Sequence, residues 1–316
     1  MNLRLTIVTS LLALSAIGAS AGQMISDAKS GKELKQYDEP CPPDTLAWMR
    51  LRSSYTGESD FERGDNASGD AFYNGVEANG RIPVGIAWPN VECGQWYFRY
   101  GAEYDRWDFN NDGGLPIPNT LQSFAAILAM EYVVRNETIA LLEVRPGFFF
   151  EHDLDLQDFD IGVLAYAPLY NTRGDDWSFT IIGGASYRGF RSVPILPVLG
   201  FVYRTGKWTV FAVPPEPRLM YQATDRLTLW TGAELTGGSF RVDDADFQKK
   251  RNINEAVVTY SEYRAGAGFS YKFPHLTVDV GGGYAFQRKF DFHRAEEGFE
   301  TDEGALYGKI ELRAAF

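Results

Sequence analysis

Apolar and polar residues alternate along most of the chain between Leu46 and Phe316. In the run 96–105, aromatic and alanine residues fill one set of alternate positions, while Arg99 and Glu103 fall in the other. Successive side chains of a β-strand point to opposite faces of the sheet, so this pattern predicts strands with one apolar and one polar face. The fourteen predicted strands are 46–57, 70–88, 95–108, 121–135, 138–151, 158–170, 176–188, 193–204, 207–213, 217–223, 226–242, 255–273, 275–291 and 303–316.

The strand count depends on the segment Pro214–Pro217, which contains three prolines. Proline cannot donate to a strand ladder, so we interpret the segment as a turn between two short strands. A kink within one strand would give thirteen strands, whereas bacterial single-chain barrels normally have an even number, and counts of 12 or 16 stay open. Longer connections such as 243–254 fall at odd positions and short ones such as 205–206 at even positions, as in a barrel with both termini in the periplasm.

The first 21 residues have the pattern of an export signal. Arg4 precedes an apolar stretch from Leu5 to Gly18, and small residues at 19–21 predict cleavage before Gly22. This stretch is shorter than the roughly 20 apolar residues of a membrane anchor. We therefore predict three parts: a signal peptide at 1–21, a polar periplasmic lead-in at 22–45 and a barrel at 46–316.

Composition fits that organisation and disfavours one class of partner. The chain has a net charge of −12, so we expect no nucleic-acid partner, because polyanions bind through basic surfaces. It contains 22 Phe, 17 Tyr, 7 Trp and 32 Gly, which suits strands with aromatic girdles and glycine-assisted curvature. On composition alone, a soluble all-β domain explains these numbers equally well.

The export signal, the amphipathic strands over 46–316 and the closing Phe316 resemble Gram-negative outer-membrane β-barrels. In that class a terminal aromatic residue is an insertion signal for the barrel-insertion machinery; Ala314 departs from the pattern, since an aromatic residue is common there. The stretches 215–221 and 225–229 are similar to uncharacterised barrel families. The resemblance implies an all-β, antiparallel, up-and-down transmembrane barrel in contact with outer-membrane lipid and lipopolysaccharide, and it implies no activity.

If the apolar faces meet lipid, the charged residues of the strands face a lumen. The lumen-facing candidates are Arg50, Arg52, Arg99, Glu103, Glu131, Glu143, Arg145, Arg188, Glu234, Glu262, Arg264, Asp279, Lys309, Glu311 and Arg313. Opposed acids and bases across a narrow pore would filter polar solutes. Alternatively, the same charges pair with one another, fill a small lumen and stabilise the barrel.

Cys41 and Cys93 are the two cysteines of the chain. A constant hairpin register places them at the same end of the first two predicted strands, and an oxidising compartment favours a disulfide over two free thiols. Two cysteines without a nearby histidine make a poor metal site, so we expect no metal there.

The three histidines, His152, His275 and His293, lie near predicted loops, and Asp153 or Asp291 could supply a carboxylate for a hydrolase. No nucleophile motif accompanies them, so we expect no enzyme activity, no catalytic residues and no cofactor.

Two loops are rich in aspartate. Their acidic residues are Asp153, Asp155, Asp158 and Asp160 in one loop and Asp243, Asp244 and Asp246 in the other. The spacing lacks the turn glycine and closing glutamate of an EF-hand loop, so we interpret both loops as a solvated acidic rim rather than a Ca²⁺ site.

The leading functional hypothesis is a passive, porin-like channel for small hydrophilic solutes. A closed structural or surface-interaction barrel is the second hypothesis, and an outer-membrane hydrolase is the third.

Overall fold

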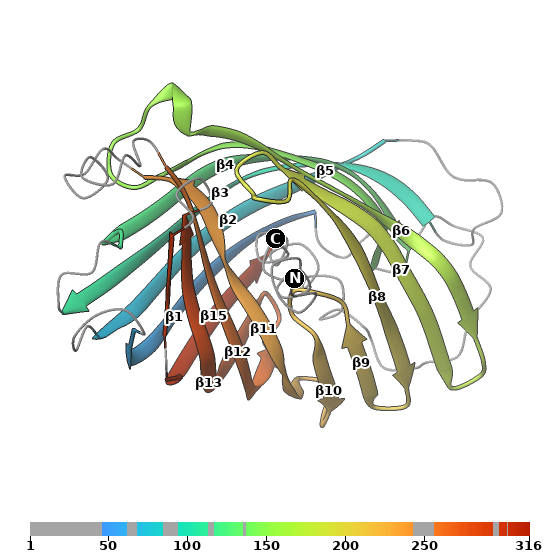
Figure 1. The fold of residues 1–316 in the computed structure, drawn as a ribbon. Coiled ribbons are helices and arrows are strands. Elements are labelled where there is room, and N and C mark those ends of the chain that lie inside the picture. The colour runs from blue at the N-terminus through green and yellow to red at the C-terminus, as the bar shows by residue number, and fades with distance from the viewer. Residues whose placement is uncertain are drawn as a thin grey trace, which may run out of the picture.

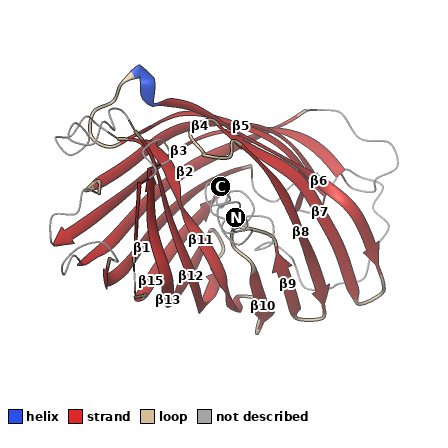
Figure 2. Cartoon of the chain, in the orientation of Figure 1, coloured by secondary structure: helices blue, strands red, loops and turns tan. Residues whose placement is uncertain are grey.

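The computed structural model describes residues 46–61, 68–84, 94–112, 117–134, 137–242, 256–292, 297–301 and 303–316. Nearly all of them form one antiparallel sheet that curls into a barrel (Figure 1, Figure 2). The strands are β1 (Ala47–Asp60), β2 (Ser68–Pro83), β3 (Gly94–Asp112), β4 (Thr120–Val134), β5 (Glu137–Phe150), β6 (Phe159–Arg173), β7 (Trp177–Arg188), β8 (Ile195–Thr205), β9 (Trp208–Ala212), β10 (Arg218–Gln222), β11 (Leu227–Arg241), β12 (Val257–Lys272), β13 (Leu276–Phe292), β14 (Glu297–Glu300) and β15 (Ala305–Ala315). A short 3₁₀ helix, η3 (Leu156–Asp158), precedes β6. No helix in the described ranges is long and apolar enough to cross a membrane.

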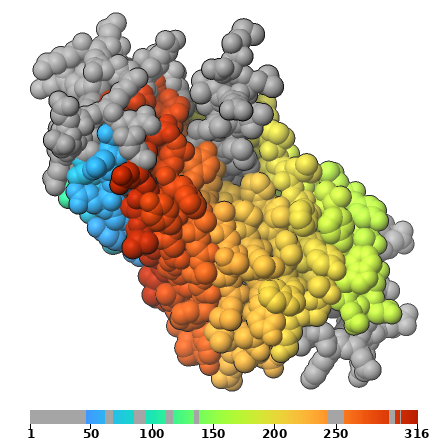
Figure 3. Space-filling model, turned by 60° about the horizontal axis from the view of Figure 1, so that its bottom comes forward, coloured from blue at the N-terminus to red at the C-terminus, as the bar shows by residue number. Residues whose placement is uncertain are grey.

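Each strand from β1 to β13 pairs with its neighbour in the chain, and β15 pairs with β1 to close the barrel. The two ends of the chain's strand region therefore lie side by side, blue against red (Figure 3). β14 and β15 both pair with β13, at 289–292 and at 276–285, so they are two parts of one last strand. The prediction of a closed, fourteen-stranded antiparallel barrel is confirmed, including the turn at Pro214–Pro217.

The two faces of the wall differ as the alternation predicts. Tyr100 and Leu306 are 47% and 75% exposed on the outside, whereas Arg99 on the inside is 2% exposed. Large apolar side chains cover the outer surface of every long strand, a pattern that in water would be a single oversized apolar patch. Charged side chains of the strands point inward, where many of them form ion pairs with one another.

One end of the barrel carries the connections β5–β6 and β7–β8, and we call it the long-loop end; the other carries tight turns such as 206–207. At the long-loop end, aromatic rings from opposite walls meet inside the barrel. We call this group the mouth cluster: Phe61, Trp107, Phe109, Phe149, Phe240, Tyr260, Phe290, Phe292 and Phe299, with smaller apolar neighbours. Phe109 of β3 contacts Tyr260 of β12 and Phe290 of β13, with centroids 4.7 and 4.9 Å apart.

A bend in β11 completes the mouth cluster. Gly237 has a φ of 127°, a backbone conformation that side chains with a Cβ rarely adopt, and a Cβ there would overlap the backbone of Tyr260. Beyond this point Phe240 reaches across the lumen to Trp107 of β3 and Phe149 of β5, with centroids 5.4 and 6.4 Å apart. Arg241 then donates a hydrogen bond to Gln157 of η3.

The wall is incomplete between β8 and β11. These strands have 11 and 15 residues, but β9 and β10 between them have only 5 each and lie at the short-turn end (Figure 1). The ladder of β8 to β9 begins at Phe201↔Ala212, so residues 195–200 have no strand partner on that side. We call the region between 195–200 of β8 and 235–241 of β11 the seam; the proline-rich segment 213–217 borders it on the side of the short-turn end.

The structure corrects one sequence interpretation, that of the acidic rim, and several others concern residues outside the described ranges. Asp158 and Asp160 are not a solvated rim: they are 4% and 7% exposed, because Asp158 accepts from the N–H of Asp155 and Asp160 accepts from backbone N–H groups of β6 and the β7–β8 connection. The signal peptide, the lead-in, residues 243–255 with their aspartates, His293, Cys41 and Cys93 lie outside the described residues.

Candidate functional site

Next to the mouth cluster the lumen contains a partly open cavity; the space between its walls is about 1350 Å³ when the open solvent is counted, and about 140 Å³ of it is accessible to the centres of water molecules. Inward positions of β1 to β7, β11 to β13 and β15 line it, because every strand turns alternate side chains to the inside. Eleven of the fifteen lumen-facing candidates contribute to it: Arg50, Arg52, Glu103, Glu143, Arg145, Arg188, Glu234, Arg264, Asp279, Lys309 and Glu311.

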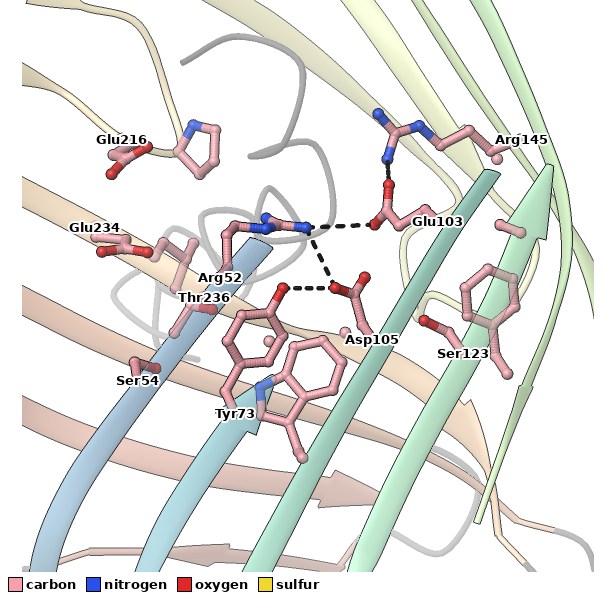
Figure 4. Close-up of a pocket in the computed structure, with 18 of the residues that line it drawn as sticks. Arg52, Ser54, Tyr73, Glu103, Asp105, Ser123, Arg145, Glu216, Glu234 and Thr236 are labelled. Carbon is pink, nitrogen blue, oxygen red and sulfur yellow. Dashed lines mark hydrogen bonds and ion pairs between the residues drawn. The ribbon is translucent and has the colours of Figure 1, made fainter. Parts of the chain in front are cut away.

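One wall of the cavity, from β1 to β5, carries a chain of alternating charges (Figure 4). Arg52 donates to Asp105 at 3.2 Å and lies 3.8 Å from Glu103, and Tyr73 also donates to Asp105, at 2.5 Å. Arg145 donates to Glu103 and to Glu143, both at 2.5 Å. These ion pairs are largely shielded from solvent, so each carboxylate depends on its arginine partner.

The facing wall, from β10 to β15, has a second charged group. Lys309 donates to Glu216 at 2.8 Å and to Glu234 at 2.6 Å, and Arg218 pairs with Glu216 and, at 3.4 Å, with Asp279. Trp230 lies under this group, with the Arg218 and Lys309 cations 4.3 and 5.1 Å from its ring. The ring can sit flat against the wall because Gly268 and Gly281 have no Cβ there.

The third side of the cavity, near the long-loop end, holds two arginines that are less well satisfied. Arg188, 8% exposed, stacks on Phe149 at 3.7 Å and lies 3.5 Å from Asp160, and its Nη2 has no hydrogen-bond partner among the described residues. Arg191, 7% exposed, donates to Ser186 at 2.7 Å. Burial, and then the neighbouring Arg188, lower the pKa of Arg191 to about 9, and the negative charge of Asp160 offsets only part of this effect.

Beside these charges, the inner face of β5 to β9 is apolar. We call it the apolar wall: Leu141, Leu164, Tyr166, Ile182, Leu196, Val198, Val202, Phe211, Val213 and Leu235 with Ala129. Leu164 and Leu235 belong both to this wall and to the cavity lining. The cavity therefore has charged side chains on two sides and an apolar surface on another. Such a lining suits a solute that has one polar or charged end and one apolar end.

The remaining four lumen-facing candidates lie away from the cavity. Arg99, 2% exposed, pairs with Glu143 and lies 3.9 Å from Glu131. Glu262 is fully buried, accepting from Arg264 at 2.9 Å and from Thr56 at 2.7 Å. Arg313 donates to Glu311 at 2.9 Å near the short-turn end. These groups join strands of the wall to one another.

The sequence patterns missed several residues of these networks. Glu77 pairs with Arg50, and Arg81 pairs with Glu131; both lie on inward positions of β2, and the alternation there would have revealed them. Glu216 falls in the proline-rich segment, where no strand parity applies. Arg191 falls in a connection, and its position in the cavity has no signal in the sequence.

The two described histidines lie outside the cavity. His152 is exposed at the long-loop end, 3.7 Å from Glu151, and His275 is exposed in the turn between β12 and β13. Within the described ranges, no group of three or more His, Cys, Asp or Glu side chains is arranged to hold a metal ion.

No protein-family model matches the sequence, and no curated protein matches it. The fold is similar to solved outer-membrane barrels. An outer membrane channel from Pseudomonas putida F1 has a TM-score of 0.43 at 9% identity, covering 90% of this chain and 100% of that one. The transport unit of the autotransporter AIDA-I from Escherichia coli has a TM-score of 0.40 at 10% identity, covering 86% and 90%. The translocator domain of NalP from Neisseria meningitidis has a TM-score of 0.32 at 11% identity, covering 86% and 89%. These likenesses concern the barrel alone.

Proposed function

We propose that this protein is an outer-membrane transport barrel, a passive channel that admits small solutes through a binding cavity in its lumen. The observation that carries the proposal is the cavity itself, a partly open space in the lumen with networks of paired acidic and basic side chains on two of its walls. A barrel that served only as a scaffold would gain nothing from holding Arg52 and Lys309 beside open space rather than in a packed interior.

The proposed location rests on the outer surface and on the export signal predicted from the sequence. Leu128 and Phe286, on different sides of the barrel, are 44% and 58% exposed, as are many large apolar residues of the outer face. Such a surface is stable in lipid, and a closed barrel leaves no unpaired strand edge around most of its circumference. We propose that signal cleavage at Gly22 delivers the chain to the outer membrane of a Gram-negative-type cell, where the insertion machinery assembles it.

The test is transport by purified protein in liposomes. We expect solutes of the size of a small sugar or amino acid to enter protein-containing liposomes faster than empty ones. We expect single-channel currents in planar bilayers to be small, because the mouth cluster narrows the lumen above the cavity. Inserted, folded protein that passes neither ions nor solutes would refute the transport function.

The mouth cluster favours one alternative. Rings from β3, β5, β11, β12 and β13 meet across the lumen, as expected of a barrel that is permanently closed and acts as a structural or surface-interaction protein. A silent but inserted protein would support that alternative. We propose no catalytic role and no cofactor, since the exposed positions of His152 and His275 offer no catalytic constellation with the cavity.

A further inference from the structure

Side chains, rather than a backbone ladder, close the seam. β9 ends at Ala212 and β10 begins at Arg218. Among the described residues, the segment 213–217 between them accepts two backbone hydrogen bonds from β11, from the N–H groups of Ala233 to Pro217 at 3.0 Å and of Leu235 to Pro215 at 2.9 Å. The prolines at 214, 215 and 217 have no N–H to donate to either neighbouring strand. Instead, Leu196 and Val198 of β8, Val213 of the proline-rich segment and Leu235 of β11 belong to the same apolar cluster, the apolar wall.

Opening the wall at the seam has a different free-energy cost from opening it between two paired strands. Opening a strand ladder in lipid exposes unsatisfied N–H and C=O groups, each costing several kcal/mol. Separating apolar side chains of the seam, such as those of Leu196 and Val213, exposes mainly hydrocarbon, which lipid or an apolar solute can cover. The seam is therefore the part of the wall that opens at the lowest free-energy cost.

The seam also joins the cavity by a continuous apolar surface. Leu235 belongs both to the cavity lining and to the apolar cluster at the seam. Leu164 also belongs to both, and it extends the apolar surface along the cavity toward Arg188. At that end Arg188 has an unpartnered, buried Nη2 and Arg191 lies beside it. An anionic group at this position would accept the free donor of Arg188 and add a second negative charge, beside Asp160, to the pair of arginines.

We propose that the cavity takes amphipathic anions, with the headgroup on Arg188 and Arg191 and the apolar chain along the apolar wall, and that they pass between lumen and membrane sideways through the seam. This inference rests on the proposed transport function and names its substrate class. The recognised chemistry is a permanent or ionised oxyanion attached to a hydrocarbon chain.

Binding tests the first half of the inference. The probe is decanesulfonate, a permanent anion with a ten-carbon chain, measured by isothermal titration with the full-length protein in nanodiscs. Methanesulfonate keeps the headgroup without the chain, and decyltrimethylammonium keeps the chain with the opposite charge. We expect decanesulfonate to bind at least tenfold more tightly than either, because each lacks one of the two contacts.

Variants locate the site. Arg188→Gln with Arg191→Gln should weaken decanesulfonate binding about tenfold or more, since two charged donors are lost. Asp160 keeps its bonds from the N–H groups of Ile161, Gly189 and Phe190, so the variant should fold. Arg226→Gln removes the same charge at an exposed turn and should leave binding unchanged. Arg188→Lys should bind with intermediate affinity. Equal binding of decanesulfonate by wild type and the double variant would overturn the headgroup site.

A reversible cross-link tests the lateral route. In a chain carrying Cys41→Ser and Cys93→Ser, Val198→Cys and Leu235→Cys can be joined across the seam by a short bis-thiosulfonate reagent. The control pair, Ala265→Cys with Tyr284→Cys, joins residues that already face each other in the β12–β13 ladder. We expect the seam cross-link to stop decanesulfonate flux across liposomes, and a reductant to restore it, while methanesulfonate flux continues and the control pair changes neither.

The outcomes separate the two proposals. Undiminished decanesulfonate flux through the cross-linked seam would overturn the lateral route and leave the transport function standing. Absence of flux for both sulfonates in the wild-type protein would overturn the transport function and the lateral route together, whereas the titration would still report on the headgroup site.

Discussion

Phe240 offers the most direct test of whether the mouth cluster closes the lumen. It is 1% exposed and contacts rings on β3 and β5 from its place on β11, so Phe240→Ala removes contacts that cross the barrel. Replacing a buried phenylalanine by alanine typically costs about 3–5 kcal/mol. Two ring pairs, each contributing roughly 0.5–1.5 kcal/mol, account for part of that loss. We expect a destabilised barrel with a larger single-channel current, because the ring fills space inside the lumen between β11, β3 and β5.

The matched control is Phe286→Ala, which removes the same atoms from a ring that is 58% exposed on the outside of β13. We expect it to cost less than about 1 kcal/mol and to leave the current unchanged, since this ring faces lipid in either state. Denaturant unfolding in lipid vesicles measures the stability, and planar bilayers measure the current. If folded Phe240→Ala protein conducts like wild type, the mouth cluster does not limit conduction.

Four further outcomes are expected. Ala102→Arg, on the lipid face near the middle of β3, should cost about 2–4 kcal/mol in vesicle unfolding, and a smaller loss would place this face away from lipid. Arg145→Gln should shift reversal potentials in a salt gradient toward cation preference, because it removes one of the two arginines beside each of Glu103 and Glu143; unchanged selectivity would remove Arg145 from the conduction path. Deleting Phe316 should lower outer-membrane levels more than the stability of folded barrel, and normal levels of the truncated protein would contradict its role as an insertion signal. Non-reducing peptide mapping should show the peptides of Cys41 and Cys93 joined, whereas two alkylatable thiols would refute the bridge.

The strands were predictable because the period of two is imposed by backbone geometry alone. Charged residues such as Glu143 and Arg145 on β5 alternate with apolar ones. This alternation predicts a strand whether the charged face points into the barrel or away from it. The count followed from turn residues, above all the prolines at 214–217, which cannot continue a ladder. Both signals are local, so the sequence contains them without reference to the rest of the fold.

The interior was less predictable because it depends on contacts across the lumen. Parity places Phe109 and Tyr260 inside the barrel, but nothing local shows that their rings meet and close the mouth. The strand Ile195–Thr205 is apolar on both faces, so alternation could not reveal that its inner side forms the apolar wall. The bend at Gly237 decides which rings Phe240 can reach, and glycine alone does not specify a bend.

The ladder between the first and last strands sets the order in which this molecule can assemble. It contains nine residue pairs, and its outermost pair, Trp48↔Ala315, joins positions separated by almost the whole described chain. Contacts this distant in sequence carry a large loop-closure entropy and make folding slow. Until Ala315 is in place, β1 presents a free edge, a template for pairing with another chain. Before closure, the unpaired edge of β1 is therefore the site most exposed to pairing with another chain, and the nine-pair ladder with β15 removes it.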